Sequence, residues 1–69
     1  MTAKTNWKYT VVTNTKWLLK EFCNLDLTAT DIGSSYEDKL AQLKKNKRHP
    51  IDAAEDLAEH IADDYGIAH

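Results

Sequence analysis

The chain has 69 residues, with nine Lys and Arg against eleven Asp and Glu and a formal net charge of −2 at pH 7. This length corresponds to one small domain (1–69) with a limited hydrophobic core. The single cysteine excludes an intramolecular disulfide, and no apolar run approaches the ~20 residues of a membrane span. We therefore expect a soluble, cytoplasmic protein without membrane contact.

The first predicted element is a strand over residues 7–13, in which Trp7, Tyr9 and Val11 alternate with polar residues. Aromatic and β-branched residues with a period of two are typical of a half-buried strand. Because a lone strand leaves backbone groups without partners, it must pair with a neighbour. The alternating segment 25–30, part of 16–22 or a second chain can supply that neighbour, so a homodimer is one of the open expectations.

A helix is predicted next over residues 16–25, because Leu18 and Phe22 are four residues apart and further apolar residues flank them. An Asn-Thr pair precedes this segment and offers helix-capping side chains. Since the apolar residues of 16–22 also alternate, a second strand that forms a hairpin with the first is the alternative.

The next helix is predicted over residues 35–48. Its Ser34-Ser35-Tyr36-Glu37 start is typical of a capping box, in which Ser34 accepts a backbone hydrogen bond and Glu37 reaches back. Acids near its start and Lys and Arg near its end suit the helix dipole.

The last helix is predicted over residues 50–65, with Pro50 at a first helical position and Gly66 as a left-handed C-terminal cap. Apolar residues recur through it at spacings of three and four. The predicted fold class is therefore α+β, predominantly helical, with one N-terminal strand.

Positive and negative charges are separated along the chain. Residues 1–49 hold all nine Lys and Arg against five acids, whereas residues 50–69 hold six acids and no Lys or Arg. On a wheel of about 100° per residue, five of these acids form one stripe about 100° wide opposite the apolar face. Like charges four residues apart cost about 0.2–0.5 kcal/mol per pair, so the stripe is a candidate partner-binding surface rather than a stabilising one. Solubility, or neutralisation by the chain's own lysines, is the alternative. The acidic stripe consists of Asp52, Glu55, Asp56, Glu59 and Asp63.

Three large aromatic rings near the start of the chain, Trp7, Tyr9 and Trp17, form a second candidate surface. A core role competes with this interpretation because a small domain needs apolar volume. Any of these rings that stays exposed is a natural anchor for a partner, since Trp and Tyr dominate binding hot spots. The predicted function is a non-enzymatic protein-interaction module, such as a regulator, inhibitor or adaptor, that docks on another protein through the acidic helix or the aromatic surface.

The alternative function is a DNA-binding regulator that uses the basic segment 44–49. Cations at a helix end can contact phosphates, although no aromatic residue interrupts the run to stack on bases. The order strand, helix, helix loosely echoes a ribbon-helix-helix arrangement, in element order alone. The basic candidates are Lys44, Lys45, Lys47 and Arg48.

No pattern indicates catalysis, a cofactor or a metal. The sequence has no glycine-rich phosphate loop, CxxC, HExxH or GxSxG motif. Cys23 lies in an apolar stretch and is expected to be a small buried hydrophobe. Asp56, His60 and Asp64 share one side of the last predicted helix, but metal sites normally take ligands from more than one element, so no metal site is predicted.

Overall fold

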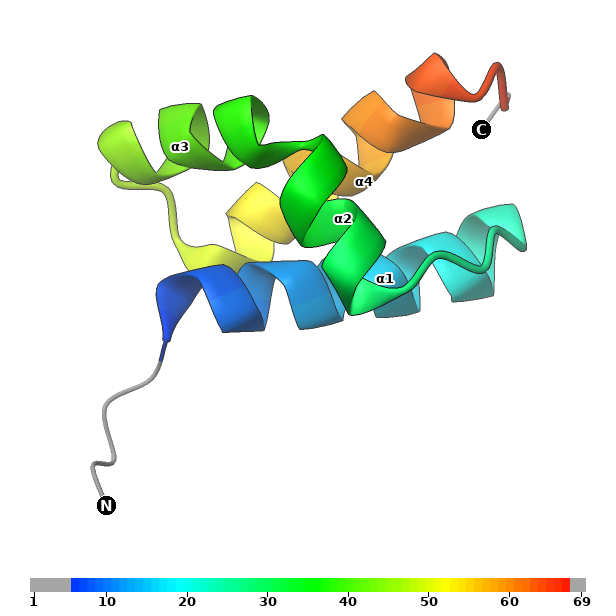
Figure 1. Cartoon of the computed structure of the whole chain (residues 1–69), viewed down its shortest axis with the longest axis horizontal. Coiled ribbons are helices and arrows are strands. Elements are labelled where there is room, and N and C mark those ends of the chain that lie inside the picture. The colour runs from blue at the N-terminus through cyan, green and yellow to red at the C-terminus, as the bar shows by residue number, and fades with distance from the viewer. Residues whose placement is uncertain (1–5, 68–69) are drawn as a thin grey trace.

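The computed structural model of the chain describes residues 6–67, and this part consists of four helices without a strand (Figure 1). The α1 and α4 helices run side by side in the same direction, and their contact is the most extensive between any two helices. The α2 helix packs on α1, and α3 packs on both α2 and α4. The helices are α1 (Trp7–Cys23), α2 (Ala29–Ser35), α3 (Glu37–Lys45) and α4 (Pro50–Asp64).

The predicted strand over 7–13 is wrong, because this segment forms the first half of α1. Asn6 caps the helix, and its Oδ1 accepts a hydrogen bond from the Tyr9 backbone N–H at 3.1 Å. The buried positions include Val11, Thr15 and Leu19, which follow one another at intervals of four. This helical period outweighs the local alternation of aromatic residues, since burial rather than propensity decides the conformation of short segments.

The same helix corrects the predictions for the following segment. Residues 16–22 are helical, so the alternative second strand is also wrong, and the helix predicted over 16–25 is the second half of α1. The expected caps lie in mid-helix instead. Asn14 and Thr15 each donate a side-chain hydrogen bond to the carbonyl four residues earlier, at 2.8 and 2.7 Å.

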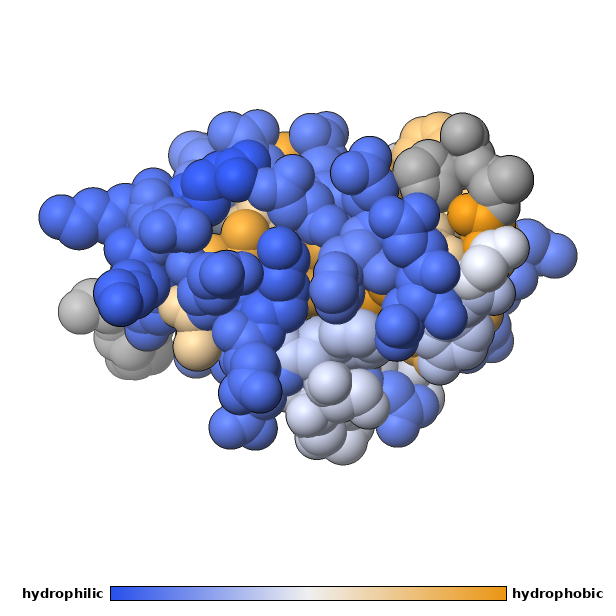
Figure 2. All heavy atoms as spheres, turned by 90° about the horizontal axis from the view of Figure 1, so that it is seen from above, coloured by the Kyte–Doolittle hydropathy of each residue, from blue (hydrophilic) through white to orange (hydrophobic). Residues whose placement is uncertain are grey.

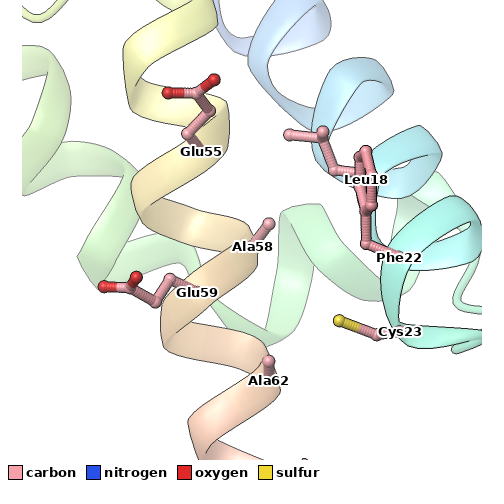
Figure 3. Close-up of a pocket in the computed structure, with 7 residues that line it drawn as sticks. All are labelled: Leu18, Phe22, Cys23, Glu55, Ala58, Glu59 and Ala62. Carbon is pink, nitrogen blue, oxygen red and sulfur yellow. The ribbon is translucent and has the colours of Figure 1, made fainter. Parts of the chain in front are cut away.

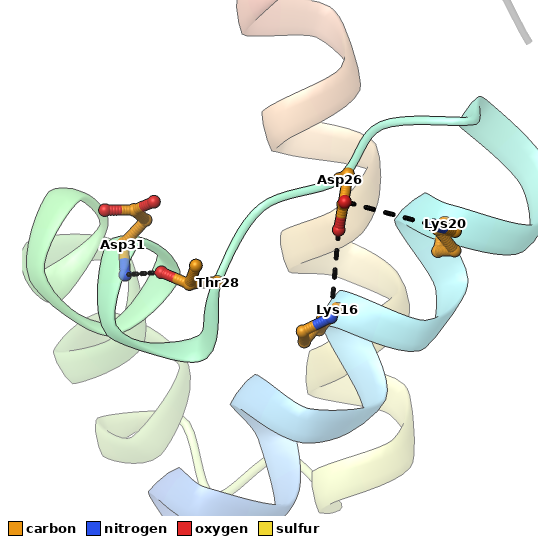
Figure 4. Close-up of polar contacts among 5 residues, drawn as sticks. All are labelled: Lys16, Lys20, Asp26, Thr28 and Asp31. Atoms are coloured by element: carbon orange, nitrogen blue, oxygen red, sulfur yellow. Dashed lines mark hydrogen bonds and ion pairs between the residues drawn. The ribbon is translucent and has the colours of Figure 1, made fainter.

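The connection from α1 to α2 is held by polar contacts (Figure 4). Asn24 takes a left-handed conformation with φ 52° and ends α1. Asp26 then lies across α1, with its carboxylate oxygens 3.9 Å from the Nζ atoms of Lys16 and Lys20. Residues 25–30 therefore form a loop and the first turn of α2, and the possible strand there is wrong. Residues 6–67 contain no strand. Neither strand-mediated dimerisation nor a ribbon-helix-helix order of elements therefore has a structural basis in this part of the chain.

The helix predicted over 35–48 is shorter in the structure, where α3 spans Glu37–Lys45, and Tyr36 separates it from α2, a helix that was not predicted. Ser34 is not an N-cap, because it lies in the last turn of α2. The cap of α2 is Thr28, whose Oγ1 accepts a hydrogen bond from the Asp31 backbone N–H at 3.0 Å (Figure 4). As predicted, the charges at the two ends of α3 suit the helix dipole: two acids lie in its first turn and two lysines in its last.

The prediction for the last helix is confirmed. Pro50 is at the start of α4, and the His49 side chain caps it by accepting a hydrogen bond from the Ile51 backbone N–H at 3.2 Å. At the other end Gly66 has φ 70°, and the Ile67 N–H donates to the Ala62 carbonyl at 2.8 Å. This is the Schellman arrangement that a left-handed glycine allows.

The buried apolar side chains form one cluster to which all four helices contribute. The side of the molecule on which α3 lies is largely hydrophilic, with apolar atoms visible only as small separate spots (Figure 2). None of the helices in residues 6–67 combines the length and the apolar character needed to cross a membrane. The cluster comprises Val11, Val12, Leu19, Ile32, Leu40, Leu43, Ala53, Ala54, Leu57 and Ile61.

Candidate functional site

A groove lies between the second half of α1 and the middle of α4 (Figure 3). It has a volume of about 180 Å³, and its walls are mostly apolar. The Cys23 sulfur and the methyl groups of Ala58 and Ala62 point into the space between the two helices. The α1 wall consists of Leu18, Phe22 and Cys23, and the α4 wall of Glu55, Ala58, Glu59 and Ala62. We call this site the α1–α4 groove.

The groove exists because α4 presents small side chains where α1 presents large ones. Ala58 and Ala62 are one helical turn apart and line one wall, opposite Leu18 and Phe22, which are also one turn apart on α1. Leu57, which precedes Ala58 on α4, is by contrast a large side chain that is fully buried in the core. Because Ala58 and Ala62 each extend only a methyl group from α4, the space between the two helices stays open.

Phe22 has the helical position of a core residue but the exposure of a surface residue. It follows Leu18 by four residues and the buried Thr15 by seven, so it lies on the side of α1 that packs on α4. Its side chain nevertheless remains 73% exposed. Trp17, 57% exposed, lies edge to face with it, with 6.1 Å between the ring centroids. The groove is thus flanked by a pair of exposed aromatic rings.

Carboxylates surround this apolar surface. Glu55 and Glu59 are exposed on the α4 lip, and their carboxylates point away from Leu18 and Phe22 (Figure 3). Neither forms an ion pair within residues 6–67. Glu21 is also exposed and lies one turn from both Trp17 and Leu18 on α1. No lysine or arginine lines the groove.

The rest of the predicted acidic stripe lies outside the groove. Asp52 and Asp63 are exposed on α4, whereas Asp56 is half-buried in an ion pair with Arg48. Asp56 is therefore paired with a cation of the chain itself, although with an arginine and not with the lysines that the alternative interpretation named. Two of the five predicted acids, Glu55 and Glu59, belong to the groove.

The predicted aromatic residues do not form one surface. Trp7 is half-buried, and its Nε1–H donates a hydrogen bond to the Arg48 carbonyl at 3.0 Å. Tyr9 is 69% exposed but lines a separate, more polar hollow near the start of α1. Only Trp17 lies beside the groove, through its contact with Phe22.

The predicted basic residues belong to the end of α3 and the connection to α4. Lys44 and Lys45 are exposed in the last turn of α3, and Lys47 takes a left-handed conformation with φ 56°. Arg48 is held by Asp56 and by Trp7. None of the four lines the α1–α4 groove.

The three residues considered for a metal have other partners. Asp56 pairs with Arg48, His60 lies edge to face with Tyr36 at 5.7 Å between centroids, and Asp64 accepts a hydrogen bond from the Tyr36 hydroxyl at 3.0 Å. Burial, together with the adjacent Asp64 carboxylate, raises the pKa of Tyr36 from 10.0 to about 12. Across residues 6–67, no three His, Cys, Asp or Glu side chains are grouped so that they could hold a metal ion.

The groove was not predicted from the sequence: Phe22 served only as part of the apolar spacing of the helix predicted over 16–25, Ala58 and Ala62 were not singled out as site residues, and Cys23, expected to be buried, is half-buried. One signal was available. Two alanines one turn apart, next to two glutamates with the same spacing, indicate a shallow apolar strip beside a charged one. The sequence does not reveal that α1 runs alongside this strip.

Compared with family models, with curated proteins and with solved structures, the chain has no significant match.

Proposed function

We propose that this chain is a non-enzymatic protein-interaction module that docks on another protein through the α1–α4 groove. The observation that carries the proposal is the exposed Phe22–Trp17 pair beside an open apolar groove. Exposed apolar patches on small proteins mark interaction sites, and aromatic residues dominate binding hot spots.

The size of the groove supports a protein partner over a small ligand. Its volume of about 180 Å³ is close to the roughly 150 Å³ of an engineered cavity that holds one benzene ring. Sites for cofactors and drug-sized ligands typically measure about 300–1,000 Å³. The groove therefore matches one or two anchoring side chains of a larger partner. Its two carboxylates are at the lip and point outward, whereas a catalytic site needs its charged groups to converge on the substrate.

The test compares two alanine-to-glutamine variants in affinity capture from the source cell. Ala58→Gln fills the groove, while Ala41→Gln places the same side chain at an exposed position of α3 that is outside it. Circular dichroism and urea unfolding establish that both variants fold. We expect the wild type and Ala41→Gln to recover the same stoichiometric protein, and Ala58→Gln to lose it, with or without nuclease treatment.

Two results contradict the proposal. A partner that Ala58→Gln retains docks elsewhere on the surface. A partner that disappears on nuclease treatment is bridged by nucleic acid, and this result supports the DNA-binding alternative through Lys44, Lys45 and Lys47. The identity of the recovered protein assigns the module's role as regulator, inhibitor or adaptor.

A further inference from the structure

We infer that the occupant of the α1–α4 groove is a basic amphipathic α-helix of the partner. The inference rests on the proposed function and specifies the chemistry of the partner at that site.

The shape of the groove favours a helix. Both walls are helical, and each offers pairs of lining residues one turn apart: Leu18 and Phe22 on α1, and Ala58 and Ala62 on α4. An apolar helix face repeats at i, i+4 and i+7 and can place successive anchors along such a groove. The small, half-buried side chain of Ala58 allows the backbone of an incoming helix to approach closely, whereas Ala62 is buried. Residues 6–67 contain no sheet edge that an extended segment could join.

The charges around the groove favour a basic helix. Glu55 and Glu59 stand one turn apart on the same lip, and Glu21 lies near the other wall. Two lysines of α1, Lys16 and Lys20, are each paired with Asp26. A helix whose apolar face enters the groove with Lys or Arg beside that face satisfies these carboxylates. Such exposed pairs contribute more to association rate and specificity than to affinity, and salt weakens them.

A second copy of the chain fits less well. In a two-fold contact the same patch faces itself, so the acidic lips of both copies would be brought together. Like charges placed opposite each other disfavour that arrangement.

The experiment uses three fluorescein-labelled model peptides of about 18 residues, long enough to form a helix on binding. All three share one leucine face and differ only on the polar face, which carries lysine, glutamine or glutamate. Fluorescence anisotropy measures their dissociation constants for the full chain at about 150 mM salt and again at about 500 mM. We expect the lysine peptide to bind most tightly and the glutamate peptide most weakly. The ratio of their dissociation constants should shrink at high salt.

Two pairs of variants separate shape from charge. Ala58→Gln and Phe22→Ala should each weaken all peptides by about tenfold or more, as expected for a central anchor site. The double variant Glu55→Gln/Glu59→Gln should weaken the lysine peptide and leave the glutamine peptide unchanged. Its matched control, Glu37→Gln/Asp38→Asn, removes the same charge from α3 and should change neither.

The outcomes distinguish this inference from the proposed function. If the three peptides bind equally well, and Ala58→Gln abolishes binding, the groove docks a helix but its preference for a basic one is wrong. If no peptide binds while Ala58→Gln still loses the captured partner, the helical occupant is wrong and the proposed function stands. If the lysine peptide binds regardless of Ala58→Gln and Phe22→Ala, it contacts only surface charge and the inference fails. Sedimentation that shows a dimer lost on Ala58→Gln assigns the groove to a second copy and also overturns it.

Discussion

The rings of Trp17 and Phe22 meet edge to face on the surface of α1, with their centroids 6.1 Å apart, while each ring stays more than half exposed. The sequence contains one phenylalanine and two tryptophans. A chain this short has little apolar volume with which to build a core. Leaving two of its largest rings at the mouth of a groove is therefore a cost to folding that binding would offset.

The first prediction concerns that cost. Phe22→Ala removes most of a large side chain, yet the side chain is 73% exposed, so we expect a loss of less than about 1 kcal/mol in the free energy of unfolding. Ile61→Val removes a single methylene from a fully buried side chain and should cost about 0.5–1.5 kcal/mol. Urea unfolding measures both. A loss for Phe22→Ala well above that for Ile61→Val would place Phe22 in the core and remove the groove.

The two glycines should respond to alanine with opposite signs. At Gly33, in α2, an added Cβ would lie 3.7 Å from Lys8 Cε, an ordinary contact, so Gly33→Ala should stabilise the fold by about 0.5–1 kcal/mol through helix propensity. At Gly66, φ is 70°, and alanine there should cost roughly 1 kcal/mol or more. Thermal and urea unfolding of both variants provide the check. A destabilised Gly33→Ala variant would argue against the helical conformation of α2.

The sequence predicted α4 well because all its signals agree: proline at the start, helical apolar spacing and a glycine cap. It failed for the first half of α1 because Trp7, Tyr9 and Val11 satisfy a strand period over a few residues. The helical period of the buried residues becomes visible only over a longer stretch, and the Asn6 cap lies just before it. The sequence also missed the break at Tyr36. There Ser34 resembles an N-cap, but Thr28, with Asp31 three residues later, starts a separate helix earlier.

A histidine N-cap is a weak point of α4. His49 accepts one backbone hydrogen bond, from Ile51, whereas aspartate caps a helix better and adds a negative charge at the positive end of the dipole. His49→Asp should therefore raise the free energy of unfolding by about 0.5–1 kcal/mol at pH 7, and His49→Ala should lower it by a comparable amount. Equal stability for the aspartate and alanine variants would show that this side chain does not cap α4.

Tyr36 gives a prediction for alkaline pH. Because its pKa is raised from 10.0 to about 12 by burial and by Asp64, the folded state favours the protonated phenol. The resulting stabilisation is complete below pH 10 and is lost as the pH rises towards about 12. Urea unfolding of the wild type and Tyr36→Phe across this range isolates the effect, since the other tyrosines and the lysines titrate in both proteins. The stability advantage of the wild type should shrink with rising pH, and an advantage that stays constant would contradict the raised pKa of Tyr36.

The candidate site was predicted only in part. The acidic stripe on α4 includes Glu55 and Glu59, and both border the groove. Helical periodicity alone could not show that Asp56 is paired with Arg48, because that contact depends on how the chain turns between α3 and α4. Nor could it show that α4 runs alongside α1, which places Ala58 and Ala62 opposite Leu18 and Phe22.

The most direct test of the docking site is an NMR titration of the isotope-labelled chain with the partner recovered by the wild type. If the groove is the docking surface, the largest amide and methyl shift changes will be at Leu18, Phe22, Ala58 and Ala62, and the α3 residues will change little. Changes that centre on Lys44 and Lys45, with the four groove residues unmoved at saturation, would contradict it.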